Sequence, residues 1–327
     1  MPISVKDVSE LRKATGAGMM DCKQALKESD GDFEGALDYL RKKGQKVAAK
    51  RADRDANEGV VVALLNDDGT HGTLLALSSE TDFVAKNDDF IGFANSLAEL
   101  AASNNAATKE DVLALEIDGM TVAEKLVEKT GIIGEKIEIS DYQTVSGDTI
   151  ASYIHAGSKI GVLVSFKDGG NAEAPNFFRS VAMHIAAMSP SILHPSEFEE
   201  DFVKNETEAL RAQIISENET NARENLGKPQ KNVPQFASQR QLTAEVMAEA
   251  EEAIKAQLKE EGKPEKIWDK IVPGKLERFV QDNTLLDQER CLLSQTYALD
   301  DTKTVEAAIK ALSADAEILA FRRVAVG

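Results

Sequence analysis

The side chains that could carry catalysis or bind a metal are few and scattered in this sequence. Two cysteines and four histidines stand far from one another: Cys22, Cys291, His71, His155, His184 and His194. A zinc site needs ligands at close spacing, and a disulfide framework needs several cysteines. No glycine-rich phosphate loop follows a strand-like run, and no motif supplies a nucleophile with a histidine and an acid. The sequence therefore predicts neither covalent catalysis nor a metal or cofactor.

Two of the histidines have an ordinary structural interpretation. His155 lies at an expected hairpin turn, and His184 lies within an amphipathic helical pattern. A hydrogen-bonded structural histidine is favoured over a catalytic one at both positions. Hydrolase and transferase functions are therefore disfavoured.

A carboxylate and a large ring stand together in residues 79–87, SETDFVAKN. This stretch follows an apolar run at 73–77, typical of a strand, and precedes a helical pattern at 90–101, so it occupies a strand-to-helix junction. Asp82 and Phe83 could form a recognition tip, in which the ring supplies buried area and the charge supplies orientation. Alternatively, Thr81 caps a helix and Phe83 packs its first turn into the core. The residues by themselves favour this second interpretation.

Length and composition narrow the class of protein. A chain of 327 residues is expected to form about two to four structural units. Its apolar content of 42% is enough for folded cores, and its net charge of −18 argues against a nucleic acid partner. The N-terminus lacks an apolar signal core, and no run of about eighteen apolar residues occurs. We expect a soluble, cytoplasmic protein that binds proteins or small molecules and not a membrane.

The first 55 residues predict a three-helix module. Helical patterns cover 4–14, 19–29 and 32–43, with Gly44 as the expected stop of the third helix. The module is similar in form to ubiquitin-associated domains. The basic residues that follow, between Lys46 and Arg54, are interpreted as a solvated linker helix in preference to a docking strip.

The order strand, turn, strand, helix then occurs twice. The first copy has strands at 59–65 and 71–77, a helix at 87–103 and a later strand at 136–145. The second has strands at 148–155 and 159–166, a turn at 156–158 and a helix at 176–188. We therefore predict an α+β fold with two related subdomains built on antiparallel sheets. Their predicted bounds are 56–145 for one, and 146–195 with 265–327 for the other.

An inserted helical arm is predicted at 196–264. Its composition is typical of long helices, and we expect one near 196–226 and another near 239–261, packed antiparallel as a coiled coil. Such an arm suits self-association or a partner contact. Beyond it we expect a helix at 267–280, strands at 292–297 and 318–326, and a helix between those strands at 305–312.

Two motifs carry a resemblance to a known family. Residues 11–23, LRKATGAGMMDCK, followed by AL at 25–26 and GD at 31–32, closely resemble the N-terminal signature of bacterial elongation factor Ts. Residues 81–85, TDFVA, resemble the second signature of that family. The hairpin at His155, the run HIAA at 184–187 and TV at 304–305 follow in the expected order, and the resemblance extends over 5–326.

The resemblance implies a guanine-nucleotide exchange factor for elongation factor Tu. Such a factor binds elongation factor Tu·GDP, displaces magnesium and promotes GDP release so that GTP can bind, with no covalent catalysis. By the same resemblance, the residues that dislocate magnesium by wedging between two helices of the partner are Thr81, Asp82, Phe83 and Val84. Other partner contacts are expected at Arg12, Met19, Met20 and His155.

Two departures limit what the resemblance implies. Many family members have a further helix after the last strand, whereas this sequence stops at Gly327, and the arm is longer than the common form. A rival hypothesis is a scaffold or adaptor that binds peptides through the three-helix module and dimerises through the arm.

Overall fold

The computed structural model describes residues 3–155, 157–224 and 227–327. The chain divides into two compact units, Met1–Ala186 with Glu317–Gly327, and Ala187–Ala316. Helices occur with antiparallel sheets, so the predicted α+β class is confirmed. Within the described ranges, no helix combines the length and apolar character needed to cross a membrane.

Three helices open the first unit: α1 (Val5–Thr15), α2 (Met19–Glu28) and α3 (Phe33–Arg51). Ser4 caps α1 reciprocally with Asp7, because each side chain accepts the backbone amide of the other residue. Gly16, at φ 71°, ends α1 in the left-handed conformation that glycine adopts without strain. The three helices enclose a small core of Val8, Leu11, Ala17, Cys22, Ala25, Leu26 and Ala36.

The predicted stop at Gly44 is wrong, because α3 continues through this residue to Arg51. Gly44 is buried against Gly131 of α7 (Val122–Ile133). A Cβ added to Gly131 would lie only 2.3 Å from the Gly44 Cα. The two glycines therefore allow α3 and α7 to cross closely, and Gly44 does not end a helix. The basic stretch after Gly44 is helical as far as Arg51 and is joined to the core.

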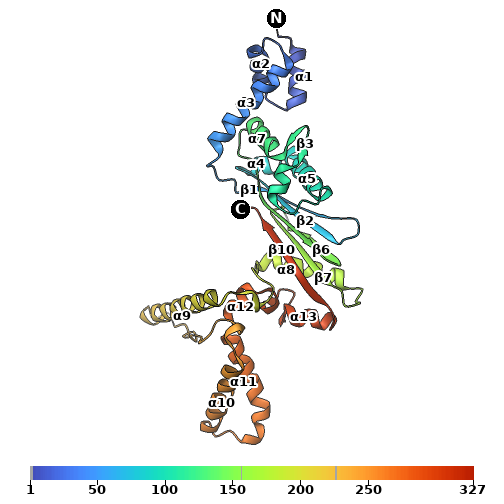
Figure 1. The fold of residues 1–327 in the computed structure, drawn as a ribbon. Helices are drawn as coiled ribbons and strands as arrows, with labels where there is room; N and C mark the ends of the chain where they lie inside the picture. Colours follow the sequence, from blue (N-terminus) through green and yellow to red (C-terminus); the bar gives the residue numbers. More distant parts are fainter. Residues whose placement is uncertain (1–2, 156, 225–226) are drawn as a thin grey trace. The chain divides into compact units, whose positions relative to one another are not determined.

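The first unit contains two three-stranded antiparallel sheets with the same topology (Figure 1). In sheet order, the first has β1 (Glu58–Leu65), β2 (His71–Ser79) and β5 (Glu138–Ser146), and the second has β10 (Glu317–Ala325), β7 (Ile160–Lys167) and β6 (Thr149–Ile154). In each sheet the second strand of a hairpin is central, and a strand from later in the chain pairs with it. The predicted recurrence of strand, turn, strand and helix is therefore present. Ala156, within the predicted second turn, lies outside the described residues.

Helices cover the first sheet on the face opposite the second sheet. They are α4 (Asp82–Ala85), α5 (Asp88–Ser103), α6 (Lys109–Ala114) and α7, and the short strands β3 (Glu116–Ile117) and β4 (Met120–Thr121) lie between α6 and α7. Its other face packs on the second sheet through Val61, Leu74, Ala76, Val145, Ile150, Leu163, Val324 and Val326. On the second sheet, Phe166 stacks on Phe178 of α8 (Ala174–Met188) at 4.1 Å between ring centroids.

The second unit is mainly helical. Its elements are η1 (Pro195–Glu197), α9 (Glu200–Arg223), η2 (Gln239–Gln241), α10 (Ala244–Glu260), η3 (Glu265–Ile267), α11 (Trp268–Asp282), α12 (Leu285–Arg290), η4 (Leu292–Ser294), β8 (Thr296–Tyr297), β9 (Asp300–Thr304) and α13 (Val305–Leu312). Its buried apolar side chains include Phe198, Val203, Ala237 and Leu286. The predicted strand at 292–297 is wrong for most of its length, because a 3-10 turn occupies Leu292–Ser294.

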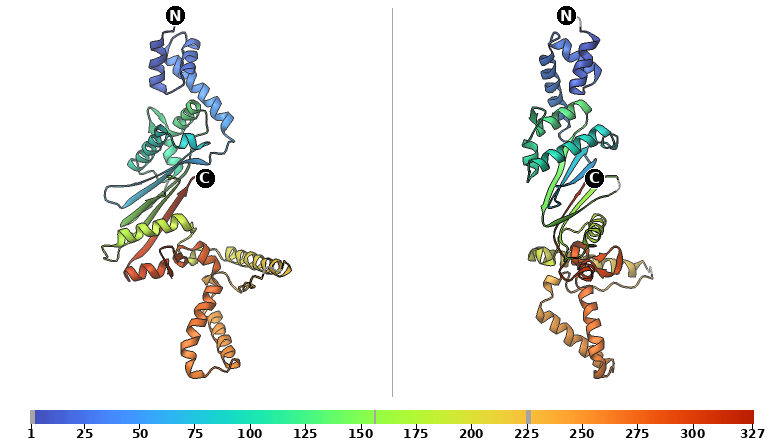
Figure 2. Two further views of the ribbon diagram at one scale, coloured as in Figure 1. Left: turned by 180° about the vertical axis from the view of Figure 1, so that it is seen from behind. Right: turned by 90° about the vertical axis from the view of Figure 1, so that its right-hand side faces the viewer.

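The helix pairing in the predicted arm also differs from the prediction. The helix that packs along α10 is α11, not α9, and both views in Figure 2 show the α10–α11 hairpin with α9 apart from it. Gly262, at φ 68°, reverses the chain between α10 and α11, whereas about twenty residues separate α9 from α10. The short connection brings neighbouring helices together. Leu226, the predicted end of the first arm helix, lies outside the described residues.

If the close crossing at Gly44 and Gly131 stabilises α3, substitutions of these glycines should change the local stability of this helix. In Gly131→Ala the added methyl meets backbone, so we expect a loss of about 1 to 3 kcal/mol in the local stability of α3. Gly44→Ala is the matched control, because its Cβ would lie at an ordinary 3.6 Å from Gly131. Amide hydrogen exchange in α3 measures the free energy of local opening. Equal protection of α3 in the two variants would show that the close crossing does not hold this helix.

Candidate functional site

The stretch Thr81–Val84 forms a tip at the junction of β2 and α5, in which Phe83 is exposed and Val84 packs half-buried against the core. Asp82–Ala85 is a single helical turn, α4, and Phe83 is 85% exposed. Thr81 precedes the turn, but its side chain makes no capping bond to it. The interpretation favoured by the residues alone, a capped helix with Phe83 packed inward, is therefore wrong. Only Ala85 of α4 is buried.

Asp82 already has a partner within the tip. Its Oδ2 accepts a hydrogen bond from Lys86 Nζ at 2.6 Å. This bond lowers the pKa of Asp82, and the more distant charge of Lys159 acts in the same direction. Asp82 is consequently an ionised carboxylate at neutral pH, held beside a cation on an exposed surface.

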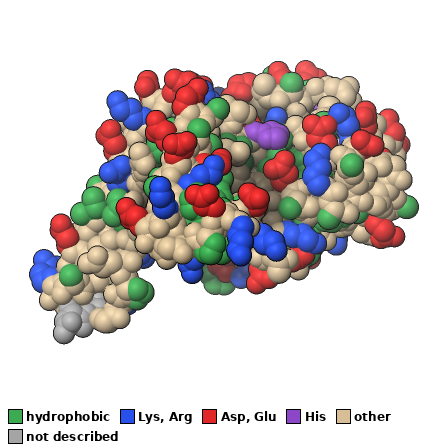
Figure 3. Space-filling view, turned by 90° about the horizontal axis from the view of Figure 1, so that it is seen from below, with side chains coloured by type: hydrophobic (Ala, Val, Ile, Leu, Met, Phe, Trp, Pro, Cys, Tyr) green, Lys and Arg blue, Asp and Glu red, His purple; other side chains and the backbone are tan. Residues whose placement is uncertain are grey.

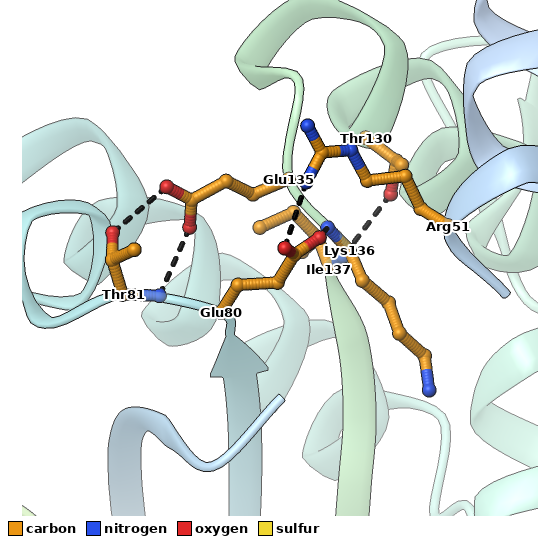
Figure 4. Close-up of polar contacts among 7 residues, drawn as sticks. All are labelled: Arg51, Glu80, Thr81, Thr130, Glu135, Lys136 and Ile137. Atoms are coloured by element: carbon orange, nitrogen blue, oxygen red, sulfur yellow. Dashed lines mark hydrogen bonds and ion pairs between the residues drawn. The ribbon is translucent and has the colours of Figure 1, made fainter. Parts of the chain in front are cut away.

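Two glutamates hold the residues that lead into the tip (Figure 4). Glu135 accepts hydrogen bonds from both the backbone amide and the hydroxyl of Thr81, at 3.0 and 2.8 Å. Glu80 accepts the amide of Lys136 at 2.7 Å and forms an ion pair with Arg51 of α3 at 2.7 Å. Burial raises the pKa of Glu80, but these hydrogen bonds and the charge of Arg51 outweigh it and lower the pKa.

A cavity of about 310 Å³ lies beside the tip. Its walls include Thr15 and Gly16 from the end of α1, Phe83 and Val84 from the tip, and apolar side chains of α5 and α7. Lys129 of α7 also lines it, with Nζ 5.1 Å from the centre of the Phe93 ring. The structure therefore brings Thr15 and Gly16, which lie within the N-terminal motif, close to the second motif, although more than sixty residues separate them in the sequence.

The other predicted contact residues lie on exposed surface. Met19 and Met20, at the start of α2, are 59% and 74% exposed, and Arg12 is exposed in the last turn of α1. His155 is exposed in the β6–β7 hairpin, where its Nδ1 lies 3.0 Å from the Tyr153 hydroxyl. His155 therefore contacts its own hairpin rather than the tip.

The described residues give little support for a metal or redox site. Among them, no group of three or more histidine, cysteine, aspartate or glutamate side chains could hold a metal ion. Cys22 and Cys291 are both free and buried, and burial raises the pKa of each thiol.

Acidic side chains are spread over the face shown in Figure 3, with lysines and arginines interspersed.

Sequence reasoning missed the residues that support the tip. Glu80 belongs to the stretch at 79–87, but no sequence pattern predicted its bonds to Arg51 and Lys136. Glu135 lies 54 residues from Thr81, so no local pattern could have linked the two. The strand-to-helix junction and the TDFVA motif pointed to the stretch at 81–84, but neither signal indicated the residues that support it.

Comparison with known proteins agrees with the motifs. The family described as "Elongation factor TS" matches residues 80–233 and 230–327. An elongation factor Ts of Rhodopirellula baltica is 68% identical over 324 residues, which cover 99% of both chains. One from Flavobacterium johnsoniae is 48% identical over 325 residues, again with 99% of both chains covered. One from Campylobacter hominis is 44% identical over 313 residues, covering 94% of this chain and 88% of the relative.

Proposed function

We propose that this chain, which belongs to the elongation factor Ts family, is a guanine-nucleotide exchange factor in translation elongation. It binds elongation factor Tu·GDP, displaces magnesium and promotes GDP release so that GTP can bind. The observation that carries the role of the tip is the 85% exposure of Phe83 on a junction fixed by Glu80 and Glu135. A large ring that is mostly exposed to water is suited to burial in another protein.

Exchange requires coupled binding and no covalent step. The factor must bind nucleotide-free elongation factor Tu more tightly than the GDP form, and GDP must then weaken the binding of the factor by the same ratio. In nucleotide-binding proteins, phosphates are held by backbone amides at a helix N-terminus and by magnesium. A wedge that displaces these groups therefore loosens GDP.

The tip residues have separate parts in this mechanism. Phe83 enters between two helices of the partner, with Thr81 and Val84 at its flanks. Asp82 supplies a negative charge that perturbs the water shell of the magnesium ion without becoming a stable ligand. Lys86 holds this carboxylate in the free protein, so the partner must compete with Lys86 for it.

The tip alone supplies too little free energy to displace a tightly held nucleotide. Burying one phenylalanine side chain contributes about 1.5 to 3 kcal/mol, or roughly one to two powers of ten in an equilibrium constant. The remaining binding energy comes from other surfaces. We assign these contacts to Arg12, Met19 and Met20 on the nucleotide-binding domain of the partner, and to His155 on a more distant domain.

We assign the regions of the chain and their partner contacts according to the predicted subdomains. Residues 1–55 form a ubiquitin-associated-like module that, with 56–145, engages the nucleotide-binding domain. Residues 146–195 and 265–327 form the second core subdomain and 196–264 the inserted arm, except that α11, which packs along α10, belongs with the arm. The protein acts in the cytoplasm, where translation occurs, and its partners are proteins rather than nucleic acid or membrane, in keeping with a net charge of −18.

Replacing Phe83 tests the role of the tip. In Phe83→Ala we expect the maximal rate of GDP release from elongation factor Tu to fall by about tenfold or more, because the wedge loses its buried ring. The affinity for nucleotide-free elongation factor Tu should fall less, since other contacts remain. Stopped-flow release of a fluorescent GDP analogue gives the rate. Ile215→Ala, at an exposed apolar residue of α9, is the control, and a wild-type rate in Phe83→Ala would exclude the wedge.

Self-association through the arm is a separate proposal. We assign it to the α10–α11 hairpin, because two exposed helices of this kind can pack on a second copy. Light scattering of the chain alone should then give a mass near twice 35.4 kDa, and dilution should lower it. A mass of 35.4 kDa at every concentration would show that the arm does not pair.

A further inference from the structure

Glu80 and Glu135 lie far apart in the sequence, but next to the tip each side chain accepts a hydrogen bond from a backbone amide beside the other. The Thr81 amide donates to Glu135 Oε2 at 3.0 Å, and the Lys136 amide donates to Glu80 Oε1 at 2.7 Å (Figure 4). Each carboxylate therefore accepts the amide of the residue that follows the other glutamate. We call Glu80, Thr81, Glu135 and Lys136 the glutamate clamp.

The remaining carboxylate oxygens of the clamp are also occupied. Glu135 Oε1 accepts the Thr81 hydroxyl at 2.8 Å, and Glu80 Oε2 accepts Arg51 Nη1 at 2.7 Å. These contacts are partly buried, and the Glu80 side chain is only 15% exposed. Hydrogen bonds to ionised groups are stronger and more directional than those between neutral groups. The clamp therefore joins the end of β2 to the segment before β5, and Arg51 adds α3.

The tip needs such support because it cannot hold itself. Its helical turn has four residues, and an isolated turn of that length is not stable in water. Phe83 is exposed, so its ring gives no anchorage to the core of the free protein. On the C-terminal side of Phe83 the chain is anchored by Val84, which packs half-buried against the core, and by the buried Ala85. On the N-terminal side the anchor to the core is Thr81, through Glu135.

We infer that Glu80 and Glu135 are positioning residues for nucleotide exchange, which fix the direction of Asp82 and Phe83 and connect the tip to α3 through Arg51. This inference rests on the proposed function. A tip that is ordered before binding loses less conformational entropy when it enters the partner. Loss of the clamp should therefore lower the maximal rate of exchange more than it alters the concentration of factor needed to reach half of that rate.

Glu135→Gln tests the inference with little change in shape. Glutamine lacks the negative charge, and its one oxygen replaces only one of the two carboxylate oxygens that accept from Thr81. We expect the maximal rate of GDP release from elongation factor Tu to fall by about tenfold, with the half-saturating concentration changed less than about twofold. Glu99→Gln is the matched control, because Glu99 is exposed on α5 and does not belong to the clamp.

Substitutions of Thr81 examine the same bonds from the donor side. Thr81→Ser keeps both donors and is the reference against which the loss of the hydroxyl is measured. Thr81→Val keeps the shape and the amide but removes the hydroxyl, so it should lower the maximal rate. This variant also serves if Glu135→Gln does not fold, which thermal unfolding followed by circular dichroism would reveal. Equal rates in Thr81→Ser and Thr81→Val, together with a wild-type rate in any folded Glu135→Gln, would overturn the inference.

A double-mutant cycle with Phe83→Ala separates positioning from general stability. If Glu135 acts through the tip, Glu135→Gln should slow exchange less than about twofold once Phe83 is already alanine. A full loss of about tenfold in both backgrounds would overturn the inference, because Glu135 would then act elsewhere. If Phe83→Ala alone releases GDP at the wild-type rate, the proposed wedge fails. If Phe83→Ala is slow and Glu135→Gln is not, only the clamp fails.

Discussion

The reciprocal contact between Glu80 and Glu135 is the interaction on which the candidate site depends. It places two carboxylates against backbone amides, and those amides lie where the chain leaves β2 and where it approaches β5. An exposed aromatic ring gains nothing from the core beneath it, so its direction must come from the backbone that carries it. The clamp supplies that direction. It explains how Phe83 can remain in water and still be ordered.

The same contact connects the tip to the N-terminal helices. Arg51 bonds to Glu80 at the end of α3, and Gly44 packs against Gly131 in the middle of that helix. Contacts at two places along α3 restrict the position of this helix more than either contact alone. The N-terminal motif lies on α1 and α2, which pack with α3, and Gly16 within this motif lines the cavity beside Phe83.

Local patterns predicted most elements of the first unit, and the errors have physical causes. Apolar runs separated by turn residues located both hairpins, and helical patterns located α1, α5 and α8. Gly44 was interpreted as a stop, because the contact with Gly131 is invisible in the local sequence. The pairing of α10 with α11 was missed because helix patterns do not identify the partner of a helix. Phe83 was assigned to the core by its type, and only the family motif indicated otherwise.

The central claim is that the tip is ordered before it meets its partner, and amide hydrogen exchange in the free protein tests this most directly. With the clamp formed, the amides of Thr81 and Lys136 should exchange slowly in the free chain, with little further protection when elongation factor Tu binds. If both amides exchange in the free chain as fast as unprotected loop amides and become protected only in the complex, then the partner orders the tip and the clamp does not.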